Sequence, residues 1–535
     1  MKLPDLATDK YRWLALVFLA LSSAIVIIDN NVLTVAIPYI LRDLHTTFNG
    51  IQWVLSGYSL IIATLLITVG RTGDLFGRKR LFLCGTILFA TGSFIASIST
   101  NVLMLFIGEA LIEAIGAAMM LTSSLALLVT EFHGRERAIA FGIWGSVAGA
   151  SASIGPLLGG FLTTYYSWRW SLRINVIIAV IAILGSVFIK EAYGKKTEKF
   201  DWLGVVFSSL GLFSLVFGCI EGRNFGWWSA VKAFAIGNLH WYQGGISIIP
   251  FIFLMAVIFL ALFIFIEYRL EKDGKEPLLR ISLFKNAGFS LGLIAIGILV
   301  MGQFGTFFIF PLYYQNVLGL TAFQTGLLFL WTSVTIAITG ALSGYLASKF
   351  GPKWIVVIGM LASFLGIFWL SSLLSIHIDL FSLVPGLILL GSGIGLASSQ
   401  VTNIILSHVP QQFSGEASAV NVTFRQIGAS IGTALIGTVL AANLAINITT
   451  IIHADKHFSP SARQYIMTQL KNYTAESGTQ ALKKRISNPQ TYRLVKTDID
   501  YSLVSAAKTA FHAGLFFIAI GIVLSVFIPE KRQVT

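Results

Sequence analysis

Charged residues are scarce in this sequence of 535 residues: 11% are Asp, Glu, Lys or Arg, whereas 56% are hydrophobic. A water-soluble domain carries about 25% charged residues. So few charges cannot cover a water-facing surface, which excludes an ordinary soluble protein. The composition therefore indicates a chain that uses lipid as its solvent.

Cysteine is almost absent, and several catalytic motifs are missing altogether. The two cysteines, Cys84 and Cys219, both lie inside apolar runs, so we expect small packed side chains and neither a disulfide nor a metal site. The sequence contains no Walker motif and no H-E-x-x-H motif. We therefore expect a protein that is not an enzyme, holds no cofactor or metal, and takes its energy from an ion gradient.

Long apolar runs fill the sequence instead. A helix that crosses the hydrocarbon of a bilayer needs about 20 apolar residues. About 14 runs meet this requirement, the weakest being 202–220, which Glu221 follows directly. They lie near 13–37, 51–70, 81–99, 102–124, 138–164, 170–189, 202–220, 246–266, 288–312, 323–347, 354–374, 379–405, 417–443 and 508–529. The sequence therefore predicts an all-α integral membrane protein.

The formal net charge of +13 comes mostly from basic residues in short loops between the runs. This pattern favours topology signals that face an anionic leaflet, and it argues against a nucleic-acid partner. If every run is a span, the basic short loops share one side. We therefore expect both termini to be cytoplasmic in a bacterial inner or plasma membrane. The basic segment 444–507 is the exception, and we expect a folded external hairpin that could dock a periplasmic adaptor.

A ten-residue pattern occurs twice, about half a chain apart. "GRTGDLFGRK" at 70–79 aligns with "GYLASKFGPK" at 344–353, and each copy lies between two apolar runs. Glycines permit a sharp turn and close helix contact, while the basic residues hold the turn at the cytoplasmic surface. We interpret the first copy as either a plain topology loop or a gating latch between two bundles. Its candidate residues are Gly70, Gly73, Asp74, Gly77, Arg78 and Lys79.

Two similar halves are typical of transporters whose substrate site lies between the repeats. We expect a six-helix bundle at 1–190, two additional helices with linkers at 191–287, and a second six-helix bundle at 288–535.

Acidic residues inside the apolar runs are the first candidates for a functional site. Asp29 lies about 16 residues into the first run, roughly 24 Å along a helix, and so in the outer half of the bilayer. Glu109 and Glu113 are four residues apart and share one helical face. Two close carboxylates in a low dielectric cannot both ionise easily, so we expect at least one of them to carry a proton.

Several further motifs make the sequence resemble the major facilitator superfamily, and within it the 14-span drug:proton antiporter branch of the EmrB/QacA type. "IDNNVLTVAIP" (28–38) is similar to the first-helix motif, and "GSVAGASASIGPLLGG" (145–160) to the antiporter motif of the fifth helix. The other matches are "WRWSLRINV" (168–176), "FDWLG" (200–204), "PLYYQNVLG" (311–319) and "NVTFRQIGASIG" (421–432). The resemblance covers nearly the whole chain and implies proton-driven export by alternating access.

The resemblance also implies roles for particular residues. The antiporter motif places Gly145, Gly149, Gly155, Pro156, Gly159 and Gly160 on one helix, where small residues allow tight contact and proline bends the helix. Arg425 occupies a family position, with Asn421 before it on the same face.

The fourth run departs from the family pattern. Ala110 stands where the branch usually has an arginine. Three alternatives follow: the glutamates carry protons directly, they bind a cationic substrate, or Arg173 supplies the missing positive charge.

Three functions remain open at this point. The first is a proton-coupled exporter of lipophilic or amphipathic compounds, cationic drugs and biocides above all. The second is an exporter of one physiological lipid-like, siderophore or peptide compound. The third is a receptor or scaffold that transports nothing.

Overall fold

A computed structural model describes residues 9–46, 48–193, 201–231, 233–236, 239–454 and 489–529 of the chain. This part contains 13 helices long and apolar enough to cross a membrane, or 14 if a bent pair of helices is counted as one span. The weakest predicted run is one of these helices, α8 (Trp202–Phe225). The other long helices are α1 (Asp9–Asp43), α2 (Phe48–Phe76), α3 (Arg78–Ser97), α5 (Ala114–Glu131), α6 (Gly134–Tyr165), α7 (Trp168–Gly185), α9 (Ile249–Lys272), α10 (Ala287–Asn316), α11 (Ala322–Phe350), α12 (Pro352–Leu373), α13 (Val384–Ser407), α14 (Ser414–Ala454) and α17 (Pro489–Val526). The predicted all-α membrane architecture is confirmed.

The fourth span is not a uniform α-helix. It begins as α4 (Val102–Leu105), continues as the π-helix η1 (Phe106–Glu113) and ends as α5. π-Helical turns inside α-helices are rare and occur frequently at functional sites. Both glutamates of the fourth run, Glu109 and Glu113, lie in this turn.

The bent span is α6, whose two parts, Gly134–Ser151 and Ile154–Tyr165, meet at 40°. Pro156 lies inside this helix. Its ring lacks an N–H donor and clashes with the carbonyl four residues earlier, at position 152, which is where the two parts meet. The bend predicted for the antiporter motif is therefore present.

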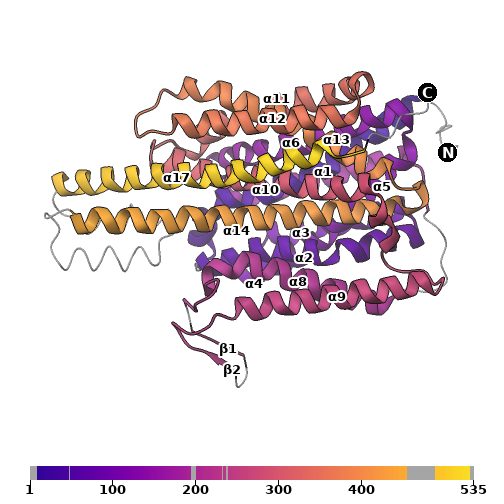
Figure 1. Ribbon diagram of the computed structural model, residues 1–535, viewed down its shortest axis with the longest axis horizontal. Helices are drawn as coiled ribbons and strands as arrows, with labels where there is room; N and C mark the ends of the chain where they lie inside the picture. The colour runs from indigo at the N-terminus through magenta and orange to yellow at the C-terminus, as the bar shows by residue number, and fades with distance from the viewer. Residues whose placement is uncertain are drawn as a thin grey trace.

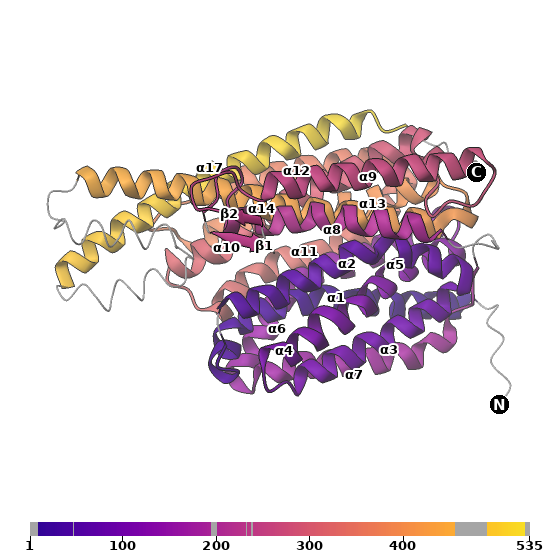
Figure 2. The same cartoon turned by 90° about the horizontal axis from the view of Figure 1, so that it is seen from below.

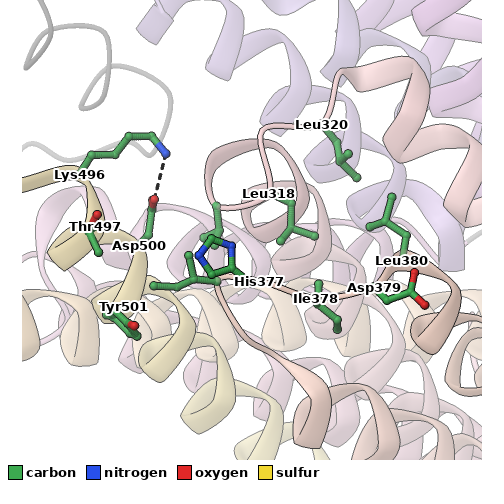
Figure 3. A pocket seen from close by; sticks show the side chains of 12 residues that line it. Leu318, Leu320, His377, Ile378, Asp379, Leu380, Lys496, Thr497, Asp500 and Tyr501 are labelled. Atoms are coloured by element: carbon green, nitrogen blue, oxygen red, sulfur yellow. Dashed lines mark hydrogen bonds and ion pairs between the residues drawn. The ribbon is translucent and has the colours of Figure 1, made fainter. Parts of the chain in front are cut away.

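The helices form one elongated bundle, with α1 to α7 on one side of Figure 2 and α10 to α17 on the other. Helices α8 and α9 pack on each other along one flank, and α8 also contacts α2 and α14 (Figure 1). The short antiparallel strands β1 (Phe234–Ile236) and β2 (Leu239–Trp241) lie beyond one end of this flank.

Two expectations need correction. Segment 444–507, expected as a folded external hairpin, is partly the continuation of two spans: α14 extends to Ala454 and α17 begins at Pro489, and together they form an arm that projects from the bundle (Figure 1). The rest of the expected hairpin lies outside the described residues. Cys84 is exposed on the surface of α3, whereas Cys219 is buried as expected. An outward-facing position on an apolar helix contacts lipid, so a small thiol is tolerated there.

Candidate functional site

Three buried carboxylates from two helices meet inside the first half of the chain. Asp29 lies on α1, and Glu109 and Glu113 lie on η1. Each residue is at most 1% exposed, and one carboxylate oxygen from each lies within 4.8 Å of the others. We call these three residues the acid triad. Asp29 is therefore not a solvated acid at a helix end.

Glycines allow α3 to pack closely against the π-helical turn. This packing determines which way the two glutamate side chains of the triad face. A Cβ atom added to Gly92 would overlap the backbone of Glu113, and one added to Gly108 would lie 2.6 Å from the amide nitrogen of Ala96. Only glycine permits such backbone contact between two helices. Because α3 closes this side of η1, the glutamates face α1 and α7.

Asn175 on α7 connects the members of the triad, although the sequence analysis did not single it out. Its side-chain amide donates to an oxygen of Asp29, and longer bonds run to Ser93 Oγ at 3.2 Å and to Glu113 Oε1 at 3.5 Å. A buried asparagine in a membrane helix is the signal that could have found it.

Polar atoms without partners surround this site. Among the described residues, the second oxygens of Asp29, Glu109 and Glu113 and the hydroxyl of Tyr58 are buried and accept or donate no hydrogen bond. Tyr58 is 2% exposed and lies in the electrostatic field of all three acids. Unpartnered buried polar atoms cost about 1–3 kcal/mol each, and these atoms are free to bond to a proton or a bound group.

Electrostatics limits the charge that the triad can hold. At an effective dielectric constant of about 20, two carboxylates at this separation repel by about 3–4 kcal/mol. In the described part of the chain, no Lys or Arg side chain forms an ion pair with any of the three. The triad is therefore suited to hold protons or a cation, and not three ionised carboxylates alone.

Arg173 does not join the triad. Asn175 faces the acids, and a residue two positions earlier on a helix points about 160° away. The Arg173 guanidinium instead lies over the ring of Trp170, with 5.2 Å between them. The alternative in which Arg173 supplies the missing positive charge therefore has no geometric support.

Arg425 and Asn421 lie in the other half, on α14. Arg425 donates to Ser398 Oγ at 3.1 Å and to Thr402 Oγ1 at 3.4 Å, both on α13. Asn421 is fully buried, and neither its side-chain oxygen nor its nitrogen has a partner among the described residues.

The last turns of α2, together with the turn that follows, join the two halves and the linker before α10. Arg71 pairs with Glu416 of α14 at 3.2 Å and with Glu276 of the linker at 3.4 Å. Arg280 pairs with Glu276 and also approaches Glu416. The sequence analysis did not anticipate Glu276 or Glu416, because nothing in a local pattern places them beside residue 71. We call these four residues the charge network.

The candidate residues of the first repeat copy each make a different contact. Asp74 accepts two hydrogen bonds from Arg78, at 3.0 and 2.8 Å, and also lies against Gly415 at the start of α14. Gly77 has φ +105°, a conformation that favours glycine. Gly70 lies against Ala419, Gly73 against Leu81, and the backbone amide of Lys79 donates to Glu191.

The antiporter motif divides between two contacts. Gly145 lies against Ser399 of α13 and Gly149 against Ile336 of α11, both in the second half of the chain. Gly155 and Gly159 pack on α1, and Gly160 is buried on the same helix. The part of the motif that holds Gly145 and Gly149 therefore forms a seam between the halves.

The second copy of the repeat lies at a contact between the halves that is equivalent to the contact made by the first copy. Gly70 on α2 lies against α14, and Gly344 on α11 lies against Ala138 and Ile139 of α6. Gly351 has φ +85°, matching the turn at Gly77. The two copies thus mark matching contacts between the halves.

A bundle of about fourteen spans, with internal repeats and ionisable groups inside the membrane, defines a multi-pass membrane transporter. The model of the Major Facilitator Superfamily matches residues 19–433, so the chain belongs to this superfamily, and the predicted family is confirmed. Its members are transporters and not enzymes.

The chain is similar to several drug-export proteins. It is 28% identical over 464 residues to the multidrug resistance protein Stp of Mycobacterium tuberculosis, covering 86% of this chain and 82% of that protein. It is 30% identical to the multidrug efflux pump LfrA of Mycolicibacterium smegmatis, covering 82% of this chain and 83% of that protein. Identity to the tetracenomycin C resistance and export protein of Streptomyces glaucescens is 30%, covering 81% and 76%.

The solved structure of the human organic anion transporter MFSD10 aligns with a TM-score of 0.58 at 12% identity, covering 96% of this chain and 99% of that one. This likeness concerns the fold alone.

Proposed function

We propose that this protein is a proton-coupled exporter of lipophilic and amphipathic compounds, cationic ones included, that works by alternating access. The observation that carries the proposal is the acid triad: three buried carboxylates within 4.8 Å of one another, with no ion-paired Lys or Arg in the described part of the chain. Such a site exchanges protons whenever it gains or loses contact with water. The similarity to Stp and LfrA supports drugs as cargo.

Proton exchange and cargo movement are coupled through charge. With its protons bound the triad is close to neutral and can be enclosed by apolar helices. When the protons leave, the charge favours a hydrated or cation-bound state. A conformational change that exposes the triad to opposite sides in turn therefore links proton entry to cargo exit.

The bundles proposed at 1–190 and 288–535 are the bodies that move. The side that carries the turn after α2 is closed, because Arg71 pairs with Glu416 and Gly70 lies against Ala419 across the halves. We assign this side to the cytoplasm from its basic loops, which places both termini there in the cell membrane. The charge network then acts as a latch that must open for cargo to enter.

The test is efflux from proteoliposomes that contain the purified full chain and a cationic dye such as ethidium. We expect a pH gradient to drive dye movement, and we expect Glu113→Gln and Glu109→Gln/Glu113→Gln to abolish this drive. Glu267→Gln is the matched control: Glu267 is buried on α9 outside the triad, and the amide oxygen of glutamine can still accept from the Leu279 amide.

If gradient-driven efflux survives in the double variant, the two glutamates do not carry the protons. Equal loss in the Glu267→Gln control would show that removing any buried carboxyl damages the protein. Efflux that proceeds at the same rate without a gradient contradicts proton coupling altogether.

A further inference from the structure

The inference concerns Arg425, a charged side chain that lies far inside a membrane span and has no acidic partner among the described residues. Its helix contributes the span Gln411–Leu444, and Arg425 lies 14 residues from the start, about 21 Å along it. This depth is well inside the hydrocarbon core, which is about 30 Å thick. In the part of the chain that the structure describes, the Arg425 guanidinium bonds only to the hydroxyls of Ser398 and Thr402.

A guanidinium offers five N–H donors and pairs best with a planar oxyanion. Two hydroxyls occupy part of this capacity and supply no negative charge. A positive charge inside a membrane without a counter-charge is costly, and such residues mark binding sites or ion paths. The missing partner is thus an anionic or strongly polar oxygen group that the described residues of this half do not provide.

Asn421 supplies a second, independent observation. It lies one helical turn before Arg425, on the same face of α14. It is fully buried, and both its amide nitrogen and its oxygen lack partners among the described residues. An amide left unpaired in the interior is unfavourable unless a ligand completes it.

The surroundings place these residues close to the seam between the halves. Ser398 and Thr402 are four residues apart and share one face of α13. The intervening residues contact the first half: Ser399 lies against Gly145, and the Gln400 amide approaches the carbonyl of Ala138 at 3.5 Å. Substrate sites of repeat transporters lie at this interface, near the midplane.

From these contacts we propose that Arg425 and Asn421 form a subsite for an acidic oxygen group of the cargo, a carboxylate or a phenolate, held between α14 and α13. The proposal rests on the proposed export function and adds to it: the acid triad in one half handles protons or a cationic group, and the second half recognises an oxyanion. The favoured cargo is then an amphipathic compound that carries an acidic oxygen.

The test is equilibrium binding to the purified full chain in detergent, which needs no proton gradient. The probes are matched pairs that differ at one group: tetramethylrhodamine with a free carboxylate against its methyl ester, and a hydroxylated anthraquinone against its methyl ether. We expect the wild-type protein to bind each free acid or phenol about tenfold or more tightly than its capped partner, as for a charge-assisted hydrogen bond.

Arg425→Gln should remove this preference and leave binding of the capped probes within about twofold of wild type. Arg425→Lys should keep part of the preference, and Asn421→Leu should reduce it. The capped probes show whether each variant is folded. Two results would overturn the proposal. One is that Arg425→Gln weakens binding of the free and the capped probe of a pair to the same degree. The other is that the wild-type protein binds the free and capped probes equally well in both pairs. Failure of gradient-driven efflux with the acid preference intact would instead count against proton coupling.

Discussion

Asn175 of α7 donates a hydrogen bond to Asp29 of α1, a residue 146 positions earlier in the chain. The same amide reaches Glu113 and Ser93. Asn175 therefore sets the relative positions of acids on two helices and stabilises their ionised forms. It is a positioning residue, because the acids and not the amide exchange protons.

We expect Asn175→Ala to shift the pH at which efflux is half-maximal upward by about one unit, since a lost hydrogen bond to a carboxylate is worth roughly 1–1.5 kcal/mol. The ionised triad loses a donor, so its protons are released only at higher pH. The measurement is dye efflux from proteoliposomes across a range of pH.

The control for this variant is Ser171→Ala, one turn away on the same helix, where the buried hydroxyl has no partner among the described residues. Its pH profile should match the wild type. A purely structural role for Asn175 would instead lower the rate at every pH without moving the midpoint.

The sequence predicted the spans, the repeat and the shared face of Glu109 and Glu113, because these follow from local hydrophobicity and helical spacing. It did not predict that Asn175 meets Asp29, or that Glu416 meets Arg71, 345 residues away. Such contacts depend on how each helix is rotated about its axis and on which helices are neighbours. The π-helical turn at Phe106–Glu113 was equally hidden, since local hydrophobic spacing does not distinguish it from an α-helix.

The Arg71–Glu416 pair is buried, with side-chain exposures of 4% and 0%. Removing one member of a buried pair costs about 3–5 kcal/mol, because the other charge loses its partner. We expect Arg71→Gln to open the side that carries the turn after α2, seen as faster hydrogen–deuterium exchange in residues 414–420. Arg71→Gln/Glu416→Gln should recover part of the protection, because no buried charge is stranded there. Equal exchange in the single and double variants would show that the pair is not coupled.

Gly344 allows α11 to touch α6. A Cβ atom at this position would lie 2.5 Å from Ile139 Cα and 2.6 Å from the Ala138 carbonyl oxygen, and backbone cannot move aside as a side chain does. We expect Gly344→Val to destabilise this closed arrangement by about 1–3 kcal/mol and to slow efflux. Thermal unfolding in detergent and the efflux rate measure the two effects. Gly514→Ala is the control, because its Cβ would meet only Ile436 Cδ1, at 3.4 Å.

Asp43 fixes the end of α1 to the start of α7. Its carboxylate accepts a hydrogen bond from Trp168 Nε1 at 2.9 Å and pairs with Arg169. The hydrogen bond from Trp168, followed by the interactions with Arg169, lowers the pKa of Asp43 below its ordinary value. A depressed pKa in the folded state stabilises the fold above the unfolded pKa of about 3.9, and this contribution is lost as the pH falls through the folded pKa.

We therefore expect Asp43→Asn to lower the free energy of unfolding at pH 7 by no more than about 1 kcal/mol, because the side chain is 45% exposed and screened by solvent. The difference from wild type should shrink as the pH is lowered below about 4, where the carboxylate of the unfolded chain takes up a proton, and should be lost as the pH falls through the lower pKa of the folded state. Thermal unfolding of both proteins at a series of pH values measures this. In a Trp168→Phe background the effect of Asp43→Asn should be smaller at pH 7, since the principal donor is gone. A difference that stays constant from pH 7 to pH 3.5 would mean that the carboxylate charge contributes nothing at this joint.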